Sequence, residues 1–271
     1  MPNDVRLDAW LVEHGFATGR DKACERIRAG EVSVNGKPVT KPAHRVGDTD
    51  TVECGGADNH VGRGGLKLEH ALSLTEPLAE GFVGLDIGAS TGGFTECLLR
   101  AGASRVFAVD VGHDQLHPSL RADARVVDLS GTDARRQEEL LKTVALSSVD
   151  VLTMDVSFIS LRAVLPSVMA FLKPNARLFL LIKPQFEAGR ADIGKKGIVS
   201  DRRVHYRVLR ELCDFFAEQG CVLEQLAASP ITGGAGRQKG NIEYVALLRR
   251  EGVAAVVDIR ELVDTGFERL H

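Results

Sequence analysis

The sequence predicts an α/β fold built around a doubly wound, mostly parallel sheet of seven strands, with a smaller α+β module in front of it. From residue 82 onward, short apolar runs typical of strands alternate with longer helix-like stretches. Such alternation is typical of parallel sheets whose two faces are covered by helices. The first 60 residues follow a different pattern, and a polar, glycine-rich stretch separates them from the rest.

The N-terminal module is predicted to combine two short helices with a hairpin. Apolar residues recur at helical spacing around 7–14 and 21–29, and "EVSVNGKPV" is an alternating strand that meets an Asn-Gly turn. The polar stretch "CGGADNH" at 54–60 marks the boundary of this module. We therefore expect a first domain at residues 1–60 and a second at 61–250.

Strands and helices alternate through the second domain. The strands are expected at residues 82–88, 105–111, 124–130, 149–156, 176–186, 221–230 and 243–250. The helical stretches include "GFTECLLRAG", "SLRAVLPSVMAFLK" and "RRVHYRVLRELCDFFAEQG". Residues 251–271 are predicted as one amphipathic helix packed on this domain. Its expected apolar stripe is Val253, Val256, Val257, Ile259, Leu262 and Val263.

The composition limits the classes of function. A net charge of −3 and a pI near 6.3 give no general attraction to nucleic acid or to membranes, so binding of either requires a local patch. The N-terminus lacks a basic segment followed by a long apolar one, and no uncharged stretch of about 18 residues occurs. The five cysteines are scattered and form no C-x-x-C pair. We therefore expect a cytoplasmic protein without a membrane partner or a metal site.

The stretch "LDIGASTGGF" at 85–94 indicates a ligand-binding turn. A strand ending in Asp86 leads through Gly88 to Gly92 and Gly93 at a helix start, where glycines permit a sharp turn and the helix offers free N–H groups. The spacing fits neither the G-x-G-x-x-G nor the G-K-[ST] phosphate template. Asp110, 24 positions after Asp86, ends the next strand, where a carboxylate accepts hydrogen bonds from ribose hydroxyls.

These features suit S-adenosylmethionine, which carries an adenosine and an amino acid but no phosphate. Asp86 is expected near the ammonium group of this cofactor. The alternative is a purely structural turn in which Asp86 caps the helix.

Charged residues close or open three apolar strands. These residues are Asp155 in "VLTMDVSF", Lys183 in "LFLLIKPQF" and Glu243 in "EYVALL". The carboxyl ends of parallel strands face the ligand crevice, so Asp155 and Lys183 are expected to point there. A desolvated lysine near a carboxylate suits proton transfer, whereas a lysine at a strand end is otherwise a solvated surface group.

Longer motifs around these residues resemble the TlyA family of ribosomal RNA 2′-O-methyltransferases. They are "VGRGGLKLEHAL", "DIGASTGGFTECLLRAGA", "VFAVDVG", "DVSFISL", "LIKPQFEAGR" and "SPITGGAGRQKGNIEYVALL". The resemblance implies a Rossmann-like, FtsJ-like methyltransferase sheet that uses S-adenosylmethionine. It also implies a catalytic set of Lys67, Asp155, Lys183 and Glu243, in which Lys183 is the base toward the 2′-hydroxyl, Asp155 holds a lysine, and Lys67 and Glu243 orient the acceptor.

The same resemblance implies the cofactor site. Its residues are Asp86, Gly88, Ser90, Thr91, Gly92, Gly93, Phe94, Asp110 for the ribose and Asp133 near the adenine. The chain departs from the family pattern in two places. It has "SGTDAR" where "RTNAR" is common, and "DVGHDQL" where "DVGYGQL" is common, so the wall formed by His113 and Asp114 differs from the family pattern.

Residues 6–46 resemble the RNA-binding domain (αL motif) of small-subunit ribosomal protein S4. The RNA-binding residues that this implies are Arg6, Arg20, Lys22, Arg26, Arg28, Lys37, Lys41 and Arg45. Residues 20–45 carry seven basic against three acidic side chains, a local patch in a slightly acidic module. A solvated helix face is the alternative. The expected partner is ribosomal RNA or a ribosomal subunit, with the target a cytidine that leaves its stack.

Three other functions are weighed against this one. A non-catalytic RNA-binding or ribosome-assembly factor would not need the complete catalytic set. A haemolysin, a label often attached to the family, would need a membrane-active segment. A nicotinamide-dependent oxidoreductase would need the absent G-x-G-x-x-G. The sequence indicates neither the oligomeric state nor the target nucleotide.

Overall fold

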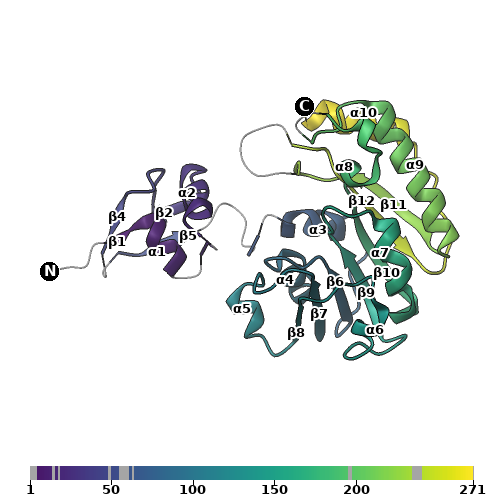
Figure 1. Ribbon diagram of the computed structural model, residues 1–271, viewed down its shortest axis with the longest axis horizontal. Coiled ribbons are helices and arrows are strands. Elements are labelled where there is room, and N and C mark those ends of the chain that lie inside the picture. The colour runs from purple at the N-terminus through teal and green to yellow at the C-terminus, as the bar shows by residue number, and fades with distance from the viewer. Residues whose placement is uncertain are drawn as a thin grey trace. The chain divides into compact units, whose positions relative to one another are not determined.

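The computed structural model describes residues 5–13, 16–17, 19–47, 50–54, 61–62, 64–194, 197–233 and 240–270. The chain divides into two compact units, residues 1–59 and 60–271 (Figure 1). Most of the predicted boundary segment, residues 55–60, lies outside the described residues.

The N-terminal unit places two helices beside short strands. Its elements are β1 (Val5–Arg6), α1 (Leu7–Glu13), α2 (Arg20–Arg28), β2 (Val32–Val34), β3 (Lys37–Pro38), β4 (Arg45–Val46) and β5 (Val52–Cys54). β2 pairs antiparallel with β3 and β5, and β1 pairs with β4. Asn35 and Gly36, with φ of 54° and 73°, form the predicted turn between β2 and β3, since such a tight hairpin needs left-handed backbone at both positions. The buried core is Leu7, Leu11, Ala23, Ile27, Val32, Val34 and Val46.

A seven-stranded sheet forms the second unit, as the sequence predicted. Its strands are β6 (Val83–Ile87), β7 (Arg105–Asp110), β8 (Val126–Ser130), β9 (Val149–Met154), β10 (Leu172–Ile182), β11 (Val222–Ala228) and β12 (Tyr244–Arg249). The strand order is β11-β12-β10-β9-β6-β7-β8. β8, β7, β6, β9 and β10 run parallel, whereas β12 lies antiparallel between β10 and β11. β12 therefore starts at the end of the sheet where β10 finishes.

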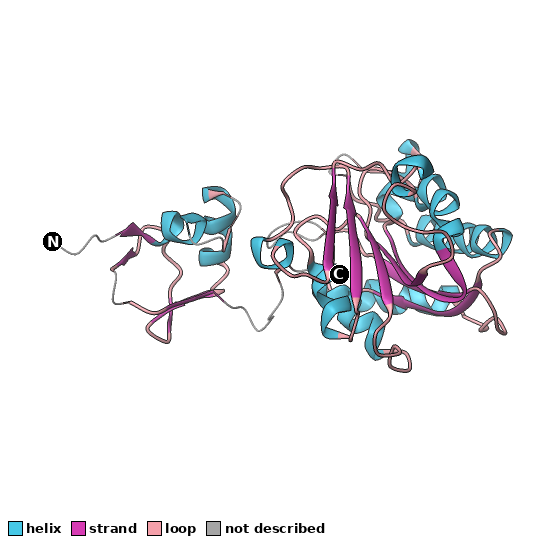
Figure 2. Ribbon diagram, turned by 90° about the horizontal axis from the view of Figure 1, so that it is seen from below, coloured by secondary structure: helices cyan, strands magenta, loops and turns pink. Residues whose placement is uncertain are grey.

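Helices cover both faces of this sheet (Figure 2). On one face, α3 (Gly64–Ser73), α4 (Gly93–Arg100) and α5 (Pro118–Arg121) share a core with Phe179 of β10 and Leu247 of β12. On the other face, α6 (Gln137–Leu140), α7 (Leu161–Val168), α9 (Arg202–Glu218) and α10 (Ile259–Leu270) pack on Leu178 and Leu248 of the same strands. The remaining helical elements are η1 (Met169–Phe171), α8 (Pro184–Glu187) and η2 (Arg190–Asp192). Adjacent strand residues thus enter opposite cores, which explains why the strands are apolar throughout.

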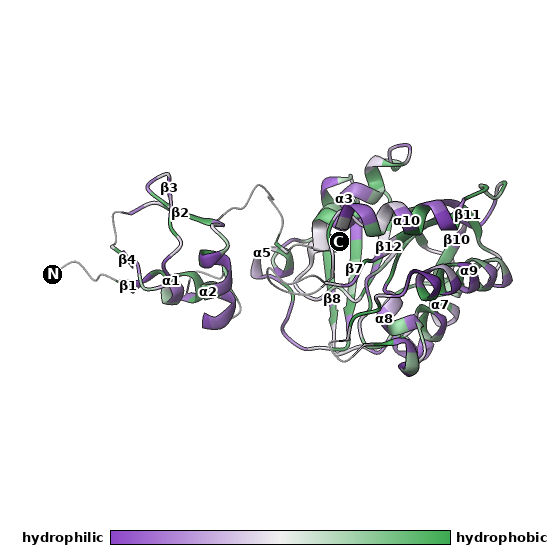
Figure 3. Ribbon diagram, turned by 90° about the horizontal axis from the view of Figure 1, so that it is seen from above, coloured by the Kyte–Doolittle hydropathy of each residue, from purple (hydrophilic) through white to green (hydrophobic). Residues whose placement is uncertain are grey.

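α9 shows why a partly polar sequence forms a long helix here. Hydrophilic and hydrophobic residues alternate around its turns (Figure 3), so one stripe faces the sheet and the rest faces solvent. The helix begins after Asp201, whose side chain accepts a hydrogen bond from the Arg203 N–H and so satisfies one of the free donors of the first turn.

The C-terminal helix is shorter than the sequence predicted. α10 begins only at Ile259, and residues 251–258 are not helical. Asp258 stops the helix from extending backward, because its carboxylate caps the first turn by accepting from the N–H groups of Arg260 and Glu261. Val253 and Val256 are 94% and 102% exposed, so their predicted place in an apolar stripe is wrong.

Candidate active site

Four charged residues from distant parts of the chain meet at one end of the sheet. Lys67 lies in α3, Asp155 follows β9, Lys183 follows β10, and Glu243 precedes β12. Because β12 runs antiparallel to β10, with Tyr244 paired to Ile182, the start of β12 adjoins the end of β10. This topology brings the four side chains to the carboxyl ends of the parallel strands, where ligands bind in open α/β sheets.

Lys67 and Glu243 form a buried ion pair. Lys67 Nζ lies 2.6 Å from Glu243 Oε2, and the two residues are 9% and 2% exposed. The other carboxylate oxygen of Glu243 accepts a hydrogen bond of 3.3 Å from Gln185 Nε2. Each buried charge is therefore compensated by a partner.

Lys183 and Asp155 form a second ion pair. Lys183 Nζ lies 2.5 Å from Asp155 Oδ1, and it donates a hydrogen bond of 2.8 Å to Ser157 Oγ. The Asp155 contact is a charge contact and not a directed hydrogen bond, since Oδ1 has no hydrogen-bond donor among the described residues. Ser157 thus fixes the direction of the ammonium group, and Asp155 supplies the opposite charge.

The two ion pairs belong to one cluster. A Cβ at Gly64, the first residue of α3, would lie 3.8 Å from Asp155 Oδ2, so this carboxylate adjoins the start of the helix that carries Lys67. The positive end of the helix dipole favours a negative charge there. Gln185, two residues after Lys183, contacts Glu243 and connects the pairs on the other side.

The glycine-rich turn holds the cluster together through close packing. Gly88 has φ of 83°, and a Cβ on it would lie 2.6 Å from the carbonyl oxygen of Asp155. A Cβ on Gly93 would lie 2.8 Å from the backbone nitrogen of Gly65 in α3. Gly88 therefore lets the residue after β9 approach the end of β6, and Gly93 lets α3 approach α4. This role is distinct from the approach to a ligand that the sequence suggested.

Asp86 supports this turn from beneath. It is fully buried, and its two oxygens accept hydrogen bonds from the Thr95 and Thr153 hydroxyls at 2.7 and 2.8 Å. Burial raises the pKa of Asp86 to about 6. In this structure both oxygens of Asp86 are taken up by threonine hydroxyls, and its predicted place near the ammonium group of the cofactor stays a prediction.

The open side of the turn is formed by Ser90 and Asp110. Ser90 is exposed, has φ of 49°, and donates its N–H to Asp110 Oδ2 at 2.9 Å. Gly112 donates its N–H to the other oxygen of Asp110 at 2.7 Å. Thr91 is half-buried, with its hydroxyl beside Gly62.

Two other predicted cofactor residues face the protein. Phe94 is 6% exposed and lies beside Gly64, and a Cβ on Gly92 would lie 2.2 Å from the Leu120 side chain. Neighbouring side chains fill the space beside both residues, and the predicted cofactor contacts of Gly92 and Phe94 stay predictions.

Asp133 and His113 lie near the ends of β8 and β7. Both oxygens of Asp133 accept hydrogen bonds from the Arg135 guanidinium, which holds the pKa of Asp133 below its usual range. His113 covers Gly131, where a Cβ would lie 2.6 Å from His113 Nε2. Asp114 is exposed and has φ of 53°. The His113 ring therefore lies against the first residue after β8.

The residues of this cluster lie within a stretch of the chain that matches a known protein family. A family model described as FtsJ-like methyltransferase matches residues 60–250, which include both ion pairs and the glycine-rich turn. The chain belongs to the FtsJ-like methyltransferase family. A second model, described as S4 domain, matches residues 5–52.

This FtsJ-like methyltransferase has relatives that match nearly its whole length. The 16S/23S rRNA (cytidine-2′-O)-methyltransferase TlyA of Mycobacterium tuberculosis is 41% identical over 93% of this chain and 92% of its own. A Brachyspira hyodysenteriae protein named Hemolysin A is 41% identical over 89% of this chain and 98% of its own. A solved structure of a Streptococcus thermophilus protein described as a hemolysin has 37% identity and a TM-score of 0.76, and covers 99% of this chain and 97% of its own. The resemblance to TlyA and the predicted fold class are confirmed.

Some of the predicted RNA-binding cations in the S4 domain of this FtsJ-like methyltransferase pair with nearby carboxylates, and most of the set is exposed. Asp8, which is 2% exposed, accepts from Arg6 at 2.8 Å and from Arg20 at 3.3 Å, and the Arg6 hydrogen bond holds the pKa of Asp8 down at about 2. Arg26 pairs with Glu31 at 3.1 Å. The exposed cations of the predicted set are Arg20, which keeps 60% of its side chain exposed despite its pair with Asp8, and Lys22, Arg28, Lys37, Lys41 and Arg45. The predicted patch therefore includes three arginines fixed by local carboxylates.

Three residues of the methyltransferase site were not identified from the sequence: Ser157, Phe158 and Gln185. Phe158 is 92% exposed, has φ of 63°, and its ring centroid lies 5.1 Å from that of Phe186. All three lie within three residues of Asp155 or Lys183. Polar and aromatic residues just after a strand end were the available signal.

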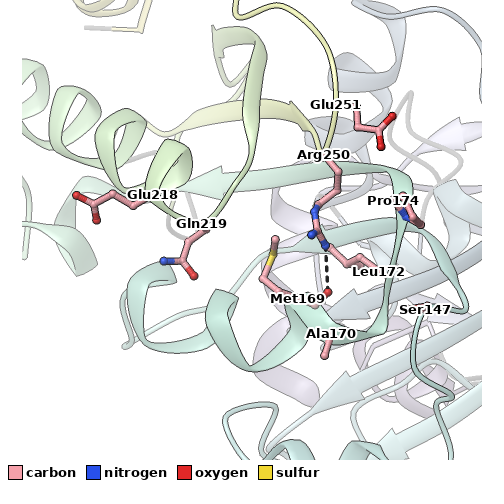
Figure 4. A pocket seen from close by; sticks show the side chains of 9 residues that line it. All are labelled: Ser147, Met169, Ala170, Leu172, Pro174, Glu218, Gln219, Arg250 and Glu251. Atoms are coloured by element: carbon pink, nitrogen blue, oxygen red, sulfur yellow. Dashed lines mark hydrogen bonds between the residues drawn. The ribbon is translucent and has the colours of Figure 1, made fainter.

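A separate cavity of about 550 Å³ lies at the opposite end of the sheet (Figure 4). It is lined by Ser147, Met169, Ala170, Leu172, Pro174, Glu218, Gln219, Arg250 and Glu251. These residues precede β9, lie in η1 or at the end of α9, begin β10 or follow β12, and none belongs to the two ion pairs. We therefore assign the chemistry to the carboxyl ends of the strands and not to this cavity.

Two kinds of feature are absent from the described ranges. No helix there is long and apolar enough to cross a membrane. No group of three or more His, Cys, Asp or Glu residues in those ranges is placed to hold a metal ion.

Proposed function

We propose that this FtsJ-like methyltransferase transfers a methyl group from S-adenosylmethionine to the ribose 2′-hydroxyl of a cytidine in ribosomal RNA. The observation that carries the proposal is the cluster of two lysine–carboxylate pairs, Lys67–Glu243 and Lys183–Asp155, beside the glycine-rich turn. The matching relative TlyA bears the name of this reaction.

The residues around the turn suit a cofactor without phosphate. The segment 85–94 contains no lysine or arginine. Asp110 lies beside Ser90 at the end of β7, where its remaining lone pairs can accept from ribose hydroxyls. We assign Gly88, Ser90 and Asp110 to the cofactor, with Asp133 near the adenine. S-adenosylmethionine, when bound, supplies an electrophilic methyl group on a sulfonium centre.

Lys183 is the residue we assign to remove the proton of the 2′-hydroxyl. A hydroxyl is a weak nucleophile until its proton is withdrawn, and Lys183 can accept that proton after its ammonium group has released one of its own to solvent. Ser157 and Asp155 hold Nζ at the end of β10. Correct placement of the reacting oxygen contributes much of the rate acceleration in such transfers.

Lys67 and Glu243 position the acceptor. Their pair is buried, so the ammonium group keeps a fixed place and its remaining hydrogens can bind oxygens of the acceptor ribose. Asp155 sits between the start of α3 and Lys183, and its charge maintains the orientation of Lys183.

The S4 domain supplies the binding of folded RNA. Its cations contact phosphates and so position the RNA without reading its sequence. The target nucleotide has to leave its stack to reach the crevice, and the exposed ring of Phe158 beside the Lys183 site offers a surface for an unstacked base. A ribosomal substrate also places the reaction in the cytoplasm.

A non-catalytic RNA-binding factor accounts for the S4 domain but not for the cluster. Burying two lysines and two carboxylates is costly unless their arrangement has a use. The name hemolysin, carried by some relatives, assigns no role to these four side chains.

The proposal is tested with ribosomal subunits and labelled S-adenosylmethionine. Purified protein is incubated with small subunits, large subunits and assembled ribosomes, and 2′-O-methylated positions are mapped. Wild type is expected to modify a cytidine, and Lys183→Ala is expected to lose at least about 100-fold in rate. Lys142→Ala, which changes an exposed lysine of the same unit, serves as the control. If wild type methylates no ribosomal RNA, the function is wrong. If Lys183→Ala retains full activity, only the assignment of the base is wrong.

A further inference from the structure

Gln185 carries a buried acceptor atom without a partner. Two acceptor atoms in the active site, Asp155 Oδ1 and Gln185 Oε1, are buried and have no hydrogen-bond donor among the described residues. Asp155 Oδ1 is compensated by the charge of Lys183 at 2.5 Å. Gln185 Oε1 has no such compensation in the described part of the chain. Buried polar atoms without partners are rare, and in a binding site such an atom marks where a ligand donates.

Glu243 fixes the orientation of the Gln185 amide. Gln185 Nε2 donates to Glu243 Oε1 at 3.3 Å, while Glu243 Oε2 is held by Lys67 at 2.6 Å. Turning the amide over would bring its oxygen against the carboxylate, which disfavours that orientation. Oε1 therefore remains an acceptor and requires a donor from the ligand.

The place of Gln185 in the sheet favours the acceptor nucleotide over the cofactor as this donor. Gln185 lies in α8, directly after the end of β10. The glycine-rich turn follows β6, which is separated from β10 by β9 in the sheet. The donor therefore belongs to the nucleotide that accepts the methyl group.

The chemistry of an internal cytidine leaves one donor for Gln185. Its 3′ and 5′ oxygens are esterified within the RNA chain and carry no hydrogen. The hydrogen of its 2′-hydroxyl passes to Lys183 in the proposed reaction. The remaining donor is the exocyclic amino group of cytosine, whereas uracil has an acceptor oxygen at that position.

We propose that Gln185 determines base specificity by accepting a hydrogen bond from the amino group of the target cytosine. A uracil would place its oxygen against Oε1, so the fixed amide both favours cytidine and disfavours uridine. This inference rests on the proposed function and adds the means by which that site selects its nucleotide.

The test uses RNA in which the mapped target position carries cytidine, uridine or a pyrimidinone riboside that lacks the amino group. Each RNA is assembled by ligation, and kcat/KM for methylation is measured for wild type, Gln185→Met and Gln185→Ala. Gln219→Met, at the opposite end of the sheet, is the matched control. Unfolding midpoints and S-adenosylmethionine binding are measured for every variant to establish that it is folded.

Wild type is expected to prefer cytidine over the pyrimidinone by roughly 10-fold, the effect of one hydrogen bond to a buried acceptor. Both Gln185 variants are expected to lose this preference while they still methylate cytidine, and Gln219→Met is expected to retain it. An unchanged preference in the Gln185 variants would overturn the proposal. An equal loss for all three RNAs would also overturn it, because Gln185 would then act only through Glu243. Absence of methylation by wild type would remove the proposed function, and this inference with it.

Discussion

Lys67 and Glu243 are 176 residues apart in the sequence, yet the ammonium nitrogen of one lies 2.6 Å from a carboxylate oxygen of the other. Glu243 is 2% exposed, so neither charge of this pair could be left alone without a large cost. The pair therefore links the stability of the fold to the geometry of the active site.

Removing one partner of this pair is expected to destabilise the protein. Glu243→Ala leaves the Lys67 ammonium group buried without a counter-charge and should lower the free energy of unfolding by about 3 to 5 kcal/mol. The double variant Lys67→Met, Glu243→Leu should recover most of this loss while remaining inactive. Denaturant unfolding and a methylation assay measure the two effects. Recovery of activity in the double variant would show that the pair has no role in the reaction.

Asp86 is expected to make stability depend on pH. Its pKa is raised by burial to about 6, above that of an unfolded aspartate, so the folded protein binds more protons than the unfolded one between about pH 4 and 6. Stability should therefore be highest below this window and fall as the pH rises through it, by on the order of 3 kcal/mol. In Asp86→Asn this fall should be absent. Unfolding free energies at pH 4 and 7 are compared, and an equal fall in both proteins would rule out Asp86 as its source.

Gly93→Ala is expected to separate α3 from α4. The new Cβ would lie 2.8 Å from the Gly65 nitrogen, a backbone atom that cannot turn away. The shift should destabilise the protein by roughly 1 to 3 kcal/mol and displace Lys67, with a loss of activity. Gly189→Ala is the control, because its Cβ would only touch the Asp192 side chain at 3.6 Å. Equal activity and stability in the two variants would contradict the proposed role of Gly93.

Neutralising exposed cations of the S4 domain is expected to weaken RNA binding without changing cofactor binding. Lys22→Gln, Arg28→Gln and Lys37→Gln should each reduce the affinity for ribosomal subunits, and each should lower the slope of log affinity against log salt by about 1. Lys142→Gln, in the other unit, should leave the slope unchanged. Affinity is measured from 50 to 200 mM salt, a range in which counterion release is readily resolved. Slopes equal to that of wild type would exclude these residues from phosphate contact.

The strands and the charged side chains at their ends could be predicted because each leaves a local signal. A charged residue that closes an apolar run, such as Asp155 or Lys183, has few alternative explanations at the carboxyl end of a parallel strand. The pairing of Lys67 with Glu243 could not be derived, because the sequence does not state which strands are neighbours. The antiparallel insertion of β12 decides it.

Other features could not be assigned from the sequence, because two roles share one pattern. An aspartate before a glycine-rich turn either contacts a ligand or supports the turn, and only the positions of Thr95 and Thr153 show that Asp86 supports it. The start of α10 was placed too early, because Val253 and Val256 have helical spacing with the true apolar residues. The capping bonds of Asp258 set the boundary instead.

The position of β12 also bears on how the enzyme is made. β12 is the last strand to leave the ribosome during synthesis, yet it inserts between β10 and β11, which emerge before it. A nascent chain that ends before Glu243 lacks the strand that lies between β10 and β11, and it has no counter-ion for Lys67. Transferase activity should therefore appear only once the strand is complete, so a prematurely terminated product has no capacity to modify the ribosome that made it.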